Sequence, residues 1–233
     1  YGVEAGADYR ATQIRQDGTR MQFEVALMGE RRIEVDLPIP GFHNVRNALA
    51  AIAVADKVGI AADAIIEGLR SFAGIDRRFE ILGEMILSPG QALLVDDYAH
   101  HPREIEATLA AAQGCWPDRR KVVVFQPHRF TRTQELLDDF SALLGGVACL
   151  VITEVYAAGE KPIPQADGRA LSRSIRARGG VDPVFVPEID QLKEALLPIL
   201  RDGDVVLTLG AGDIGRAARE LVPSVRLQEG TYG

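Results

Sequence analysis

The 233-residue chain is long enough for one large domain or two smaller ones, and its 47% apolar and 25% charged residues are ordinary for a globular protein. A formal net charge of −7 excludes a general nucleic-acid-binding protein, because neutralising phosphates requires a basic face. No apolar run reaches the roughly 18 residues of a membrane span. Cys115 and Cys149 form no paired-ligand spacing. We therefore expect a reduced, cytoplasmic protein in which both cysteines are small core residues.

Residues 1–40 have the pattern of short antiparallel strands. Residues 21–25 and 32–37 alternate apolar and polar side chains with a period of two, which predicts half-buried strands. Asp17-Gly18 predicts a tight turn before the first strand, and Met28-Gly29-Glu30 predicts the reversal between the two. Too few strands are present for an independent domain, so this sheet should belong to something larger.

A helical pattern begins at Gly41. Residues 48–54 are apolar throughout, which predicts a helix buried on all sides, and a second helix is predicted for Ala62 to Phe72. Asn44 fits two interpretations: it caps the first helix, or it presents its amide together with Asn47 to a flat ligand such as a base. Arg77 and Arg78 follow in a linker, either as a solvated face or as a clamp for phosphate.

Strands and helices alternate from about residue 81 to 222. The predicted strands are residues 91–96, 121–126, 148–154, 183–186 and 204–209, and the predicted helices are residues 103–113, 134–144, 169–178, 189–200 and 214–222. Apolar strands separated by helices predict a parallel, doubly wound α/β sheet. The polar tail, residues 227–233, is expected to fray.

Four polar loops follow these strands, at the sheet edge where such folds bind ligands. Their sequences are DDYAHHP (96–102), QPHRFTRT (126–133), YAAGE (156–160) and GAGDIG (210–215). Three of the four histidines of the chain, His100, His101 and His128, lie in the first two loops. This distribution has no use in core packing and indicates a functional centre.

The side chains of these loops suggest particular ligands. Asp96 and Asp97 should point to opposite faces of their strand, and a carboxylate there could grip a diol such as ribose or, with the histidines, bind a metal. Arg129 and Arg132 would share one face if a helix begins there, an arrangement that suits a carboxylate or a phosphate.

The run from Gly210 to Gly215 matches the G-x-G-x-x-G pattern of dinucleotide-binding turns. That fingerprint also needs a following strand with an acidic residue roughly 20 positions on, which the remaining residues do not supply. Asp213 could also cap the helix that follows. A dinucleotide-binding oxidoreductase domain, or a non-catalytic binding module, is therefore an alternative function.

Six motifs in order give a family resemblance. GFHNVRNALAA, DRRFE, DDYAHHP, FQPHRFTRT, EVYAAGE and GAGDIG together resemble the Mur ligases, and specifically the branch that joins L-alanine to UDP-N-acetylmuramate. The resemblance implies that residues 1–80 are the last part of a central ATP-binding domain. Residues 81–233 would be a Rossmann-like, doubly wound carboxyl-terminal domain.

The resemblance also implies roles for individual residues in ATP-dependent amide ligation through an acyl phosphate. Contacts to ATP are implied for His43, Asn44, Asn47, Arg78 and Asp97, and contacts to the substrates for Tyr98, His100, His128, Arg129 and Arg132. Of these, His100, His128 and Arg132 are the implied catalytic group, with Arg132 holding the alanine carboxylate. Mg²⁺ is an implied cofactor with ligands outside this sequence, so no metal-binding residue is assigned here.

One expected motif is missing: the 233 residues contain no G-x-x-G-K-[ST] phosphate-binding loop. We interpret the chain as a fragment of a longer ligase and expect no ligase activity from it in isolation.

Overall fold

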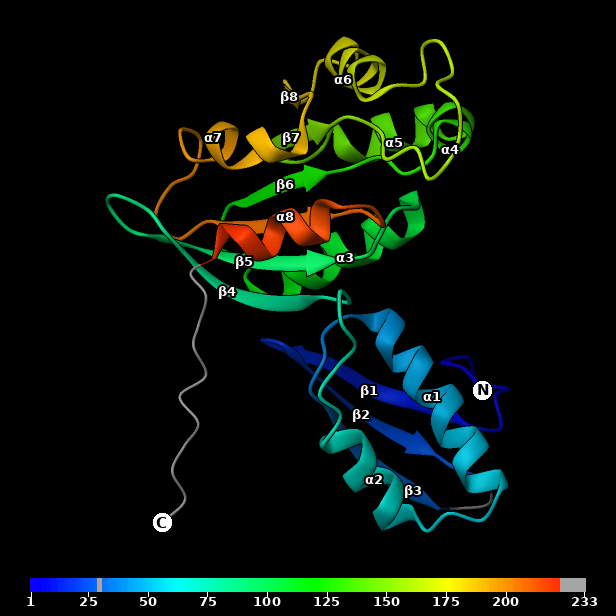
Figure 1. Cartoon of the computed structure of the whole chain (residues 1–233). Coiled ribbons are helices and arrows are strands. Elements are labelled where there is room, and N and C mark those ends of the chain that lie inside the picture. The colour runs from blue at the N-terminus through cyan, green and yellow to red at the C-terminus, as the bar shows by residue number, and fades with distance from the viewer. Residues whose placement is uncertain (29–30, 223–233) are drawn as a thin grey trace. The chain divides into compact units, whose positions relative to one another are not determined.

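The computed structural model describes residues 1–28 and 31–222, which form two compact units. One unit contains Tyr1–Phe79 and Arg103–Asp118, and the other contains Glu80–Pro102 and Arg119–Gly233 (Figure 1). The reversal predicted at Gly29-Glu30 and the tail 227–233 lie outside the described residues.

The first unit contains a three-stranded antiparallel sheet in the order β1-β2-β3. Its strands are β1 (Arg10–Asp17), β2 (Arg20–Ala26) and β3 (Arg32–Leu37). Met21, Phe23 and Val25 are buried and alternate with partly exposed polar residues, so only one face of the sheet carries the core. The alternation predicted for residues 21–25 and 32–37 is confirmed.

The helices of this unit are α1 (Phe42–Lys57), α2 (Ala62–Arg70) and nearly all of α3 (Pro102–Cys115). Leu49 and Ile52 of α1 are completely buried in a core shared with the sheet, but Val54 is 65% exposed. The prediction of a helix buried on all sides is therefore wrong. An alanine-rich helix that covers one face of a small sheet leaves its other side in solvent.

The second unit contains a six-stranded sheet in the order β4-β5-β9-β6-β7-β8. The strands are β4 (Glu80–Ile86), β5 (Gln91–Asp97), β6 (Lys121–Phe125), β7 (Cys149–Thr153), β8 (Val184–Val186) and β9 (Val205–Leu209). All neighbours pair in parallel except β4 and β5, which are antiparallel. The predicted mostly parallel α/β sheet is confirmed. The edge strand β4 was not predicted, because residues 80–86 contain Gly83 and show weak alternation.

Helices cover both faces of this sheet (Figure 1). They are α4 (Phe130–Glu135), α5 (Leu137–Leu144), α6 (Gly168–Ala177), the 3₁₀ turn η1 (Ile189–Gln191), α7 (Leu192–Leu196) and α8 (Ile214–Leu221). Val122 and Val124 share a core with α7 and α8. On the other face Phe125 packs against Phe140 of α5, with ring centroids 5.2 Å apart. The fold is therefore doubly wound, as predicted.

Two helices differ from their predicted ranges by more than two residues at one end. The helix predicted from residue 134 begins at Phe130 and is divided in two at Leu136, so Arg132 is helical. The helix predicted for residues 189–200 is shorter, consisting of η1 and α7 up to Leu196. Pro198 lies two residues beyond Leu196, and a proline cannot donate the backbone hydrogen bond that would continue a helix.

Candidate active site

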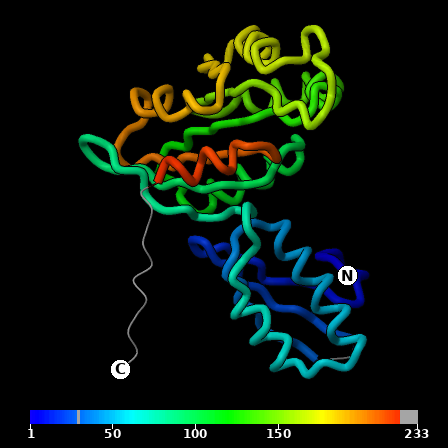
Figure 2. The backbone as a smooth tube through the Cα atoms, in the orientation of Figure 1, coloured from blue at the N-terminus to red at the C-terminus, as the bar shows by residue number. Residues whose placement is uncertain are grey.

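The candidate site lies at the carboxyl edge of the parallel strands in the second unit. Because β9 is inserted between β5 and β6, the GAGDIG turn lies between the DDYAHHP and QPHRFTRT loops. Figure 2 shows the late part of the chain coming back into the middle of the sheet. The amide of Gly210 donates to the carbonyl of Asp97 over 3.1 Å, and the amide of Gln126 donates to the carbonyl of Leu209 over 2.9 Å. These contacts join three loops that are far apart in the sequence.

The two aspartates at the end of β5 are both buried, with Asp96 0% and Asp97 6% exposed. Side chains that point to opposite faces of this strand are both buried, because an interior strand of a doubly wound sheet is covered on both faces, so neither carboxylate faces open solvent. Asp96 accepts a 2.8 Å hydrogen bond from Thr208 Oγ1. Asp97 accepts one of 2.9 Å from the amide of Ala99, which fixes the start of the loop.

Four rings follow one another along this edge. The ring centroids of Tyr98 and His100 are 5.3 Å apart, those of His100 and His128 are 5.6 Å apart, and those of His128 and Tyr156 are also 5.6 Å apart. Tyr156 stacks on His128 with an interplanar angle of 13°. The Nδ1 atom of His100 lies 2.8 Å from the carbonyl of Tyr98. The predicted residues Tyr98, His100 and His128 are thus brought together, and Tyr156 extends the row.

The guanidinium of Arg132 lies beside His128. Its Nη1 atom is 3.4 Å from His128 Nδ1 and 3.4 Å from the carbonyl of the same residue. Burial lowers the pKa of His128, and the positive charges that His100, Arg132 and Arg129 can carry lower it further. The lowered pKa favours the neutral imidazole, which can both donate and accept a hydrogen bond next to the permanent cation of Arg132.

Arg129 has a different environment from Arg132. It is the N-cap residue of α4 with φ = 73°, and its Nη1 atom lies 3.8 Å from Glu160 Oε1. Glu160 also accepts hydrogen bonds from the amide and the hydroxyl of Thr131, of 3.1 and 2.7 Å, and these bonds lower the pKa of Glu160. Because the helix begins after Arg129, the predicted pair of arginines on one helical face does not form.

The GAGDIG turn is held by Gln126, which sequence reasoning did not single out. The side-chain amide of Gln126 donates to Asp213 Oδ1 over 2.6 Å. Asp213 is the N-cap residue of α8, but its side chain makes no capping hydrogen bond to the helix. Within the described residues no strand follows α8, so the dinucleotide fingerprint remains incomplete.

Three residues were missed: Gln126, Tyr156 and Glu160. Each belongs to a loop whose sequence was recognised as following a predicted strand. The rule that ligands bind beyond the carboxyl ends of parallel strands was the signal that could have identified them.

The predicted adenine contacts lie in the first turn of α1, in the first unit. Asn44 is not the N-cap residue, since that position is Gly41. Its Nδ2 atom donates to the carbonyl of Pro40 over 2.7 Å, and Asn47 Nδ2 lies 3.3 Å from Asn44 Oδ1. The two amides therefore form one hydrogen-bonded pair a turn apart, and Asn47 is exposed.

The ring of His43 folds over Gly41, which has φ = 98°, and a Cβ added to Gly41 would lie 2.7 Å from His43 Cε1. Burial, and to a smaller extent the charge of Arg78, lowers the pKa of His43. The Nη1 atom of Arg78 is 4.0 Å from Glu104 Oε1. His43 and Arg78 thus belong to the same electrostatic neighbourhood within the first unit.

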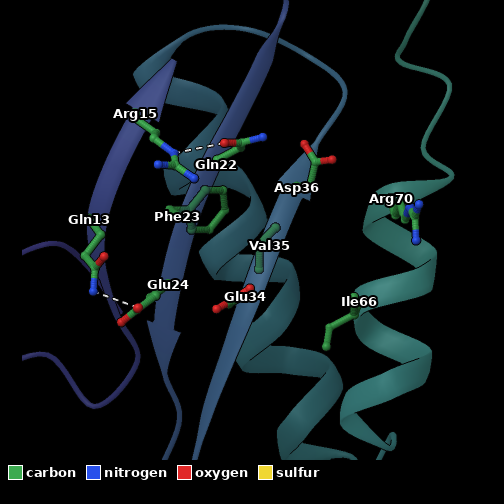
Figure 3. A pocket seen from close by; sticks show the side chains of 10 residues that line it. All are labelled: Gln13, Arg15, Gln22, Phe23, Glu24, Glu34, Val35, Asp36, Ile66 and Arg70. Atoms are coloured by element: carbon green, nitrogen blue, oxygen red, sulfur yellow. Dashed lines mark hydrogen bonds between the residues drawn. The ribbon is translucent and has the colours of Figure 1, made fainter. Parts of the chain in front are cut away.

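A pocket of about 420 Å³ lies elsewhere in the first unit, on the polar face of the sheet and beside α2 (Figure 3). Its lining mixes cations such as Arg15 and Arg70 with anions such as Glu34 and Asp36, and it contains none of the predicted site residues. Within residues 1–28 and 31–222, no three His, Cys, Asp or Glu side chains could hold a metal ion together. No helix in the same ranges is long and apolar enough to cross a membrane.

Comparisons with known proteins agree with this architecture. The Mur ligase, glutamate ligase domain matches residues 77–212, and the Mur ligase middle domain matches residues 1–55. The UDP-N-acetylmuramate–L-alanine ligase of Halorhodospira halophila is 52% identical over 221 residues, which are 95% of this chain and 46% of that protein. The ligase of the same name from Xanthomonas campestris pv. campestris is 52% identical over 223 residues, covering 95% of this chain and 47% of that protein.

Solved structures have the same fold. The crystal structure of the UDP-N-acetylmuramate–alanine ligase from Thermotoga maritima aligns with a TM-score of 0.73 and 31% identity, over 94% of this chain and 46% of that chain. A murein peptide ligase from Psychrobacter arcticus aligns with a TM-score of 0.63 and 24% identity, over 94% of this chain and 44% of that chain, and shows the fold alone. The chain spans about half the length of the curated relatives that it matches. With a family match over more than half of its residues, the chain belongs to the Mur ligase family.

Proposed function

We propose that this chain is part of an ATP-dependent ligase that joins L-alanine to UDP-N-acetylmuramate, a step in making peptidoglycan precursors. The observation that carries the proposal is the convergence of His100, His128 and Arg132 at the carboxyl edge of one sheet. The similarity to ligases of that name supports the choice of substrates.

The proposed reaction has two steps. An oxygen of the muramoyl carboxylate attacks the γ-phosphorus of ATP, which gives an acyl phosphate and releases ADP. The amine of L-alanine then attacks the acyl carbon, and the tetrahedral intermediate expels inorganic phosphate as the amide forms and the amine loses its proton. Catalysis of this type depends mainly on positioning the reactants and on stabilising phosphate charge.

In this proposal Arg132 binds the carboxylate of L-alanine. A guanidinium offers a planar fork of donors that matches a carboxylate, and it keeps its charge at any physiological pH. The neutral His128, held 3.4 Å from Arg132, limits where the amino acid can lie. Tyr98 and His100 form the neighbouring wall towards the muramoyl carboxylate, and Arg129 adds positive charge at the mouth of the same loop.

The ATP contacts are also proposals. Asn44 and Asn47 present their amides to adenine with His43 beside them, Arg78 reaches the terminal phosphate, and Asp97 holds the ribose. Mg²⁺ belongs to the proposal as a cofactor that would neutralise phosphate charge, and none of the residues named above is proposed as its ligand, since the described residues hold no cluster of three His, Cys, Asp or Glu side chains. A reducing, cytoplasmic setting, in which Cys115 and Cys149 remain free thiols, completes the proposal.

The test is a phosphate-release assay on the protein encoded by the whole reading frame that contains this chain. We expect release that requires ATP, L-alanine and UDP-N-acetylmuramate together. For the 233-residue chain assayed alone we expect none. The proposed function would be rejected if the whole protein released no phosphate, or released it without needing L-alanine. L-alanine-dependent release from the isolated 233-residue chain would reject the expectation that this chain is inactive alone.

Tight NADH binding, measured by fluorescence titration of the chain, would instead support the dinucleotide-binding alternative that the GAGDIG turn suggests.

A further inference from the structure

Gln126 is the first residue after β6, and although it is polar it is only 4% exposed. Its Nε2 atom donates to Asp213 Oδ1 over 2.6 Å, and its Oε1 atom accepts from the amide of Ile214 over 3.1 Å. A primary amide is suited to this place because it carries a donor for the carboxylate and an acceptor for the backbone N–H at the same time. The side chain thus connects the strand before QPHRFTRT to the start of α8.

The glycines of the GAGDIG turn are explained by this connection. A Cβ at Gly210 would lie 2.8 Å from the carbonyl oxygen of Gln126, and Gly210 has φ = 149°. A Cβ at Gly212 would lie 2.4 Å from Gln126 Oε1 and 2.5 Å from Tyr156 Cγ. Both positions therefore need glycine because the turn lies directly against Gln126, and Gly212 also because it lies against Tyr156.

Tyr156 carries the contact onward to His128. The amide of Tyr156 donates to the carbonyl of Pro127 over 2.8 Å, and its carbonyl accepts from the amide of Arg129 over 2.9 Å. Its ring stacks on that of His128, which in turn lies beside Arg132. A displacement of the GAGDIG turn would therefore move Tyr156, and with it the imidazole that lies beside the proposed alanine-binding guanidinium.

We infer that Gln126 is a positioning residue for the amino-acid pocket: by binding the start of α8 it holds the GAGDIG turn against Tyr156 and thereby fixes His128 beside Arg132. This inference rests on the proposed function, because the pocket it acts on is the proposed L-alanine pocket. Gln126 itself acts only through these neighbours and does not contact the substrate.

Gln126→Glu is the first variant, because it places a second carboxylate against Asp213. We expect the KM for L-alanine to rise roughly tenfold or more, since displacements of about 1 Å at a site have effects of that size or larger. The KM for ATP should stay within about twofold. A merely structural role would instead lower the thermal midpoint of unfolding and the amount of active enzyme without separating the two KM values.

The rescue variant is Gln126→Glu combined with Asp213→Asn. In this pair the new asparagine donates to the new carboxylate, so the bond between the two side chains is restored in the reversed direction, and the amide of Ile214 keeps its acceptor. We expect the KM for L-alanine to return to within about threefold of the wild-type value, and Asp213→Asn alone completes the double-mutant cycle. Gln134→Glu, the same chemical change at an exposed position of α4, is the matched control and should leave both KM values unchanged.

The outcomes separate the two claims. A wild-type protein without L-alanine-dependent phosphate release would overturn the proposed function and this inference together. An active wild type in which Gln126→Glu leaves the KM for L-alanine unchanged, or in which the double variant fails to restore it, would overturn the inference alone. If Gln126→Glu does not fold, Gln126→Met removes the same hydrogen bonds without adding charge. It should raise the KM for L-alanine and leave the KM for ATP nearly unchanged. Equal effects on the two KM values, or none, would equally overturn the inference.

Discussion

Arg132 and Arg129 are three residues apart, yet their surroundings differ. Arg132 lies 3.4 Å from the neutral His128, whereas Arg129 lies 3.8 Å from the carboxylate of Glu160. An arginine beside a carboxylate is partly neutralised, and an arginine beside a neutral imidazole keeps its attraction for an incoming anion. Arg132 is therefore the better candidate for binding the carboxylate of an amino acid.

In the whole protein, Arg132→Ala should raise the KM for L-alanine roughly tenfold to a hundredfold and leave that for ATP nearly unchanged. The range corresponds to about 1.5–3 kcal/mol for hydrogen bonds to a charged group. Steady-state kinetics with each substrate varied in turn would measure it. Arg173→Ala, at an exposed position of α6, is the control. A large rise for ATP with little change for L-alanine would assign this loop to the nucleotide.

Gly212→Ala tests the close packing of the turn. Its Cβ would lie 2.4 Å from Gln126 Oε1 and 2.5 Å from Tyr156 Cγ, so the turn has to shift. We expect a loss of about 1–3 kcal/mol in the free energy of unfolding, typical of overpacking, measured by urea denaturation. Gly146→Ala, where the nearest atom is at 3.7 Å, should change it much less. Equal stability of the two variants would show that the turn has room that the structure does not indicate.

At the scale of elements, the strands from β5 to β9 were all predicted, because short β-branched runs between helices have a strong local pattern. The position of β9 between β5 and β6 could not be predicted, since the sequence of a strand does not say which strands it pairs with. Part of the site could not be predicted for the same reason. The loops with His100 and His128 were recognised separately, but the contact of the GAGDIG turn with Gln126 depends on that strand order.

The opposite edge of β9 and β6 is held by an ion pair. Arg120 binds Asp204 through two hydrogen bonds of 2.9 and 2.6 Å, and the Asp204 side chain is only 3% exposed. Arg120→Ala should lower the free energy of unfolding by about 3 kcal/mol, because the buried carboxylate loses its cationic partner and is left with the hydrogen bond from the amide of Arg201. Arg178→Ala breaks a pair with Asp138, whose side chain is 92% exposed, and should cost less than about 1 kcal/mol. Urea denaturation of both variants measures the contrast, and similar losses would contradict it.

At the scale of the whole molecule, the sequence predicted an antiparallel sheet followed by a doubly wound α/β fold, and both are present. The boundary predicted between residues 80 and 81 stays a prediction. The structure groups residues 103–118 with the first unit although they lie in the middle of the second by sequence. A grouping of this kind arises from contacts between distant residues, which local periodicity does not encode. Local periodicity likewise says nothing about how the predicted ATP-binding residues are placed relative to the predicted substrate-binding residues.

Stability should fall in two pH windows. The pKa values of His43 and His128 are lowered by burial, so below pH about 6.5 the unfolded chain takes up protons that these folded residues resist, and the free energy of unfolding decreases. Hydrogen bonds lower the pKa values of Asp36 and Asp56, so their contribution is present above pH about 4 and is lost as the pH falls further. Urea denaturation between pH 8 and pH 3 would show both decreases.

A variant at His128 gives the control. His128→Phe keeps a ring against Tyr156 but cannot be protonated, so it should reduce the decrease near pH 6 without affecting that near pH 4. An unchanged profile for this variant would show that His128 is not a source of the pH dependence.

The insertion of β9 has a consequence for the way the chain is made. Because the ribosome releases β5 and β6 long before residues 205–209, the two strands that flank β9 emerge with their facing edges unpaired. The middle of the sheet can close only after the later strand has left the exit tunnel and entered between strands that already exist. Until then DDYAHHP and QPHRFTRT are loops on separate pieces of structure, and the row of rings from Tyr98 to Tyr156 cannot assemble. The site can therefore assemble only after residues 205–209 have been synthesised, although its loops are made much earlier.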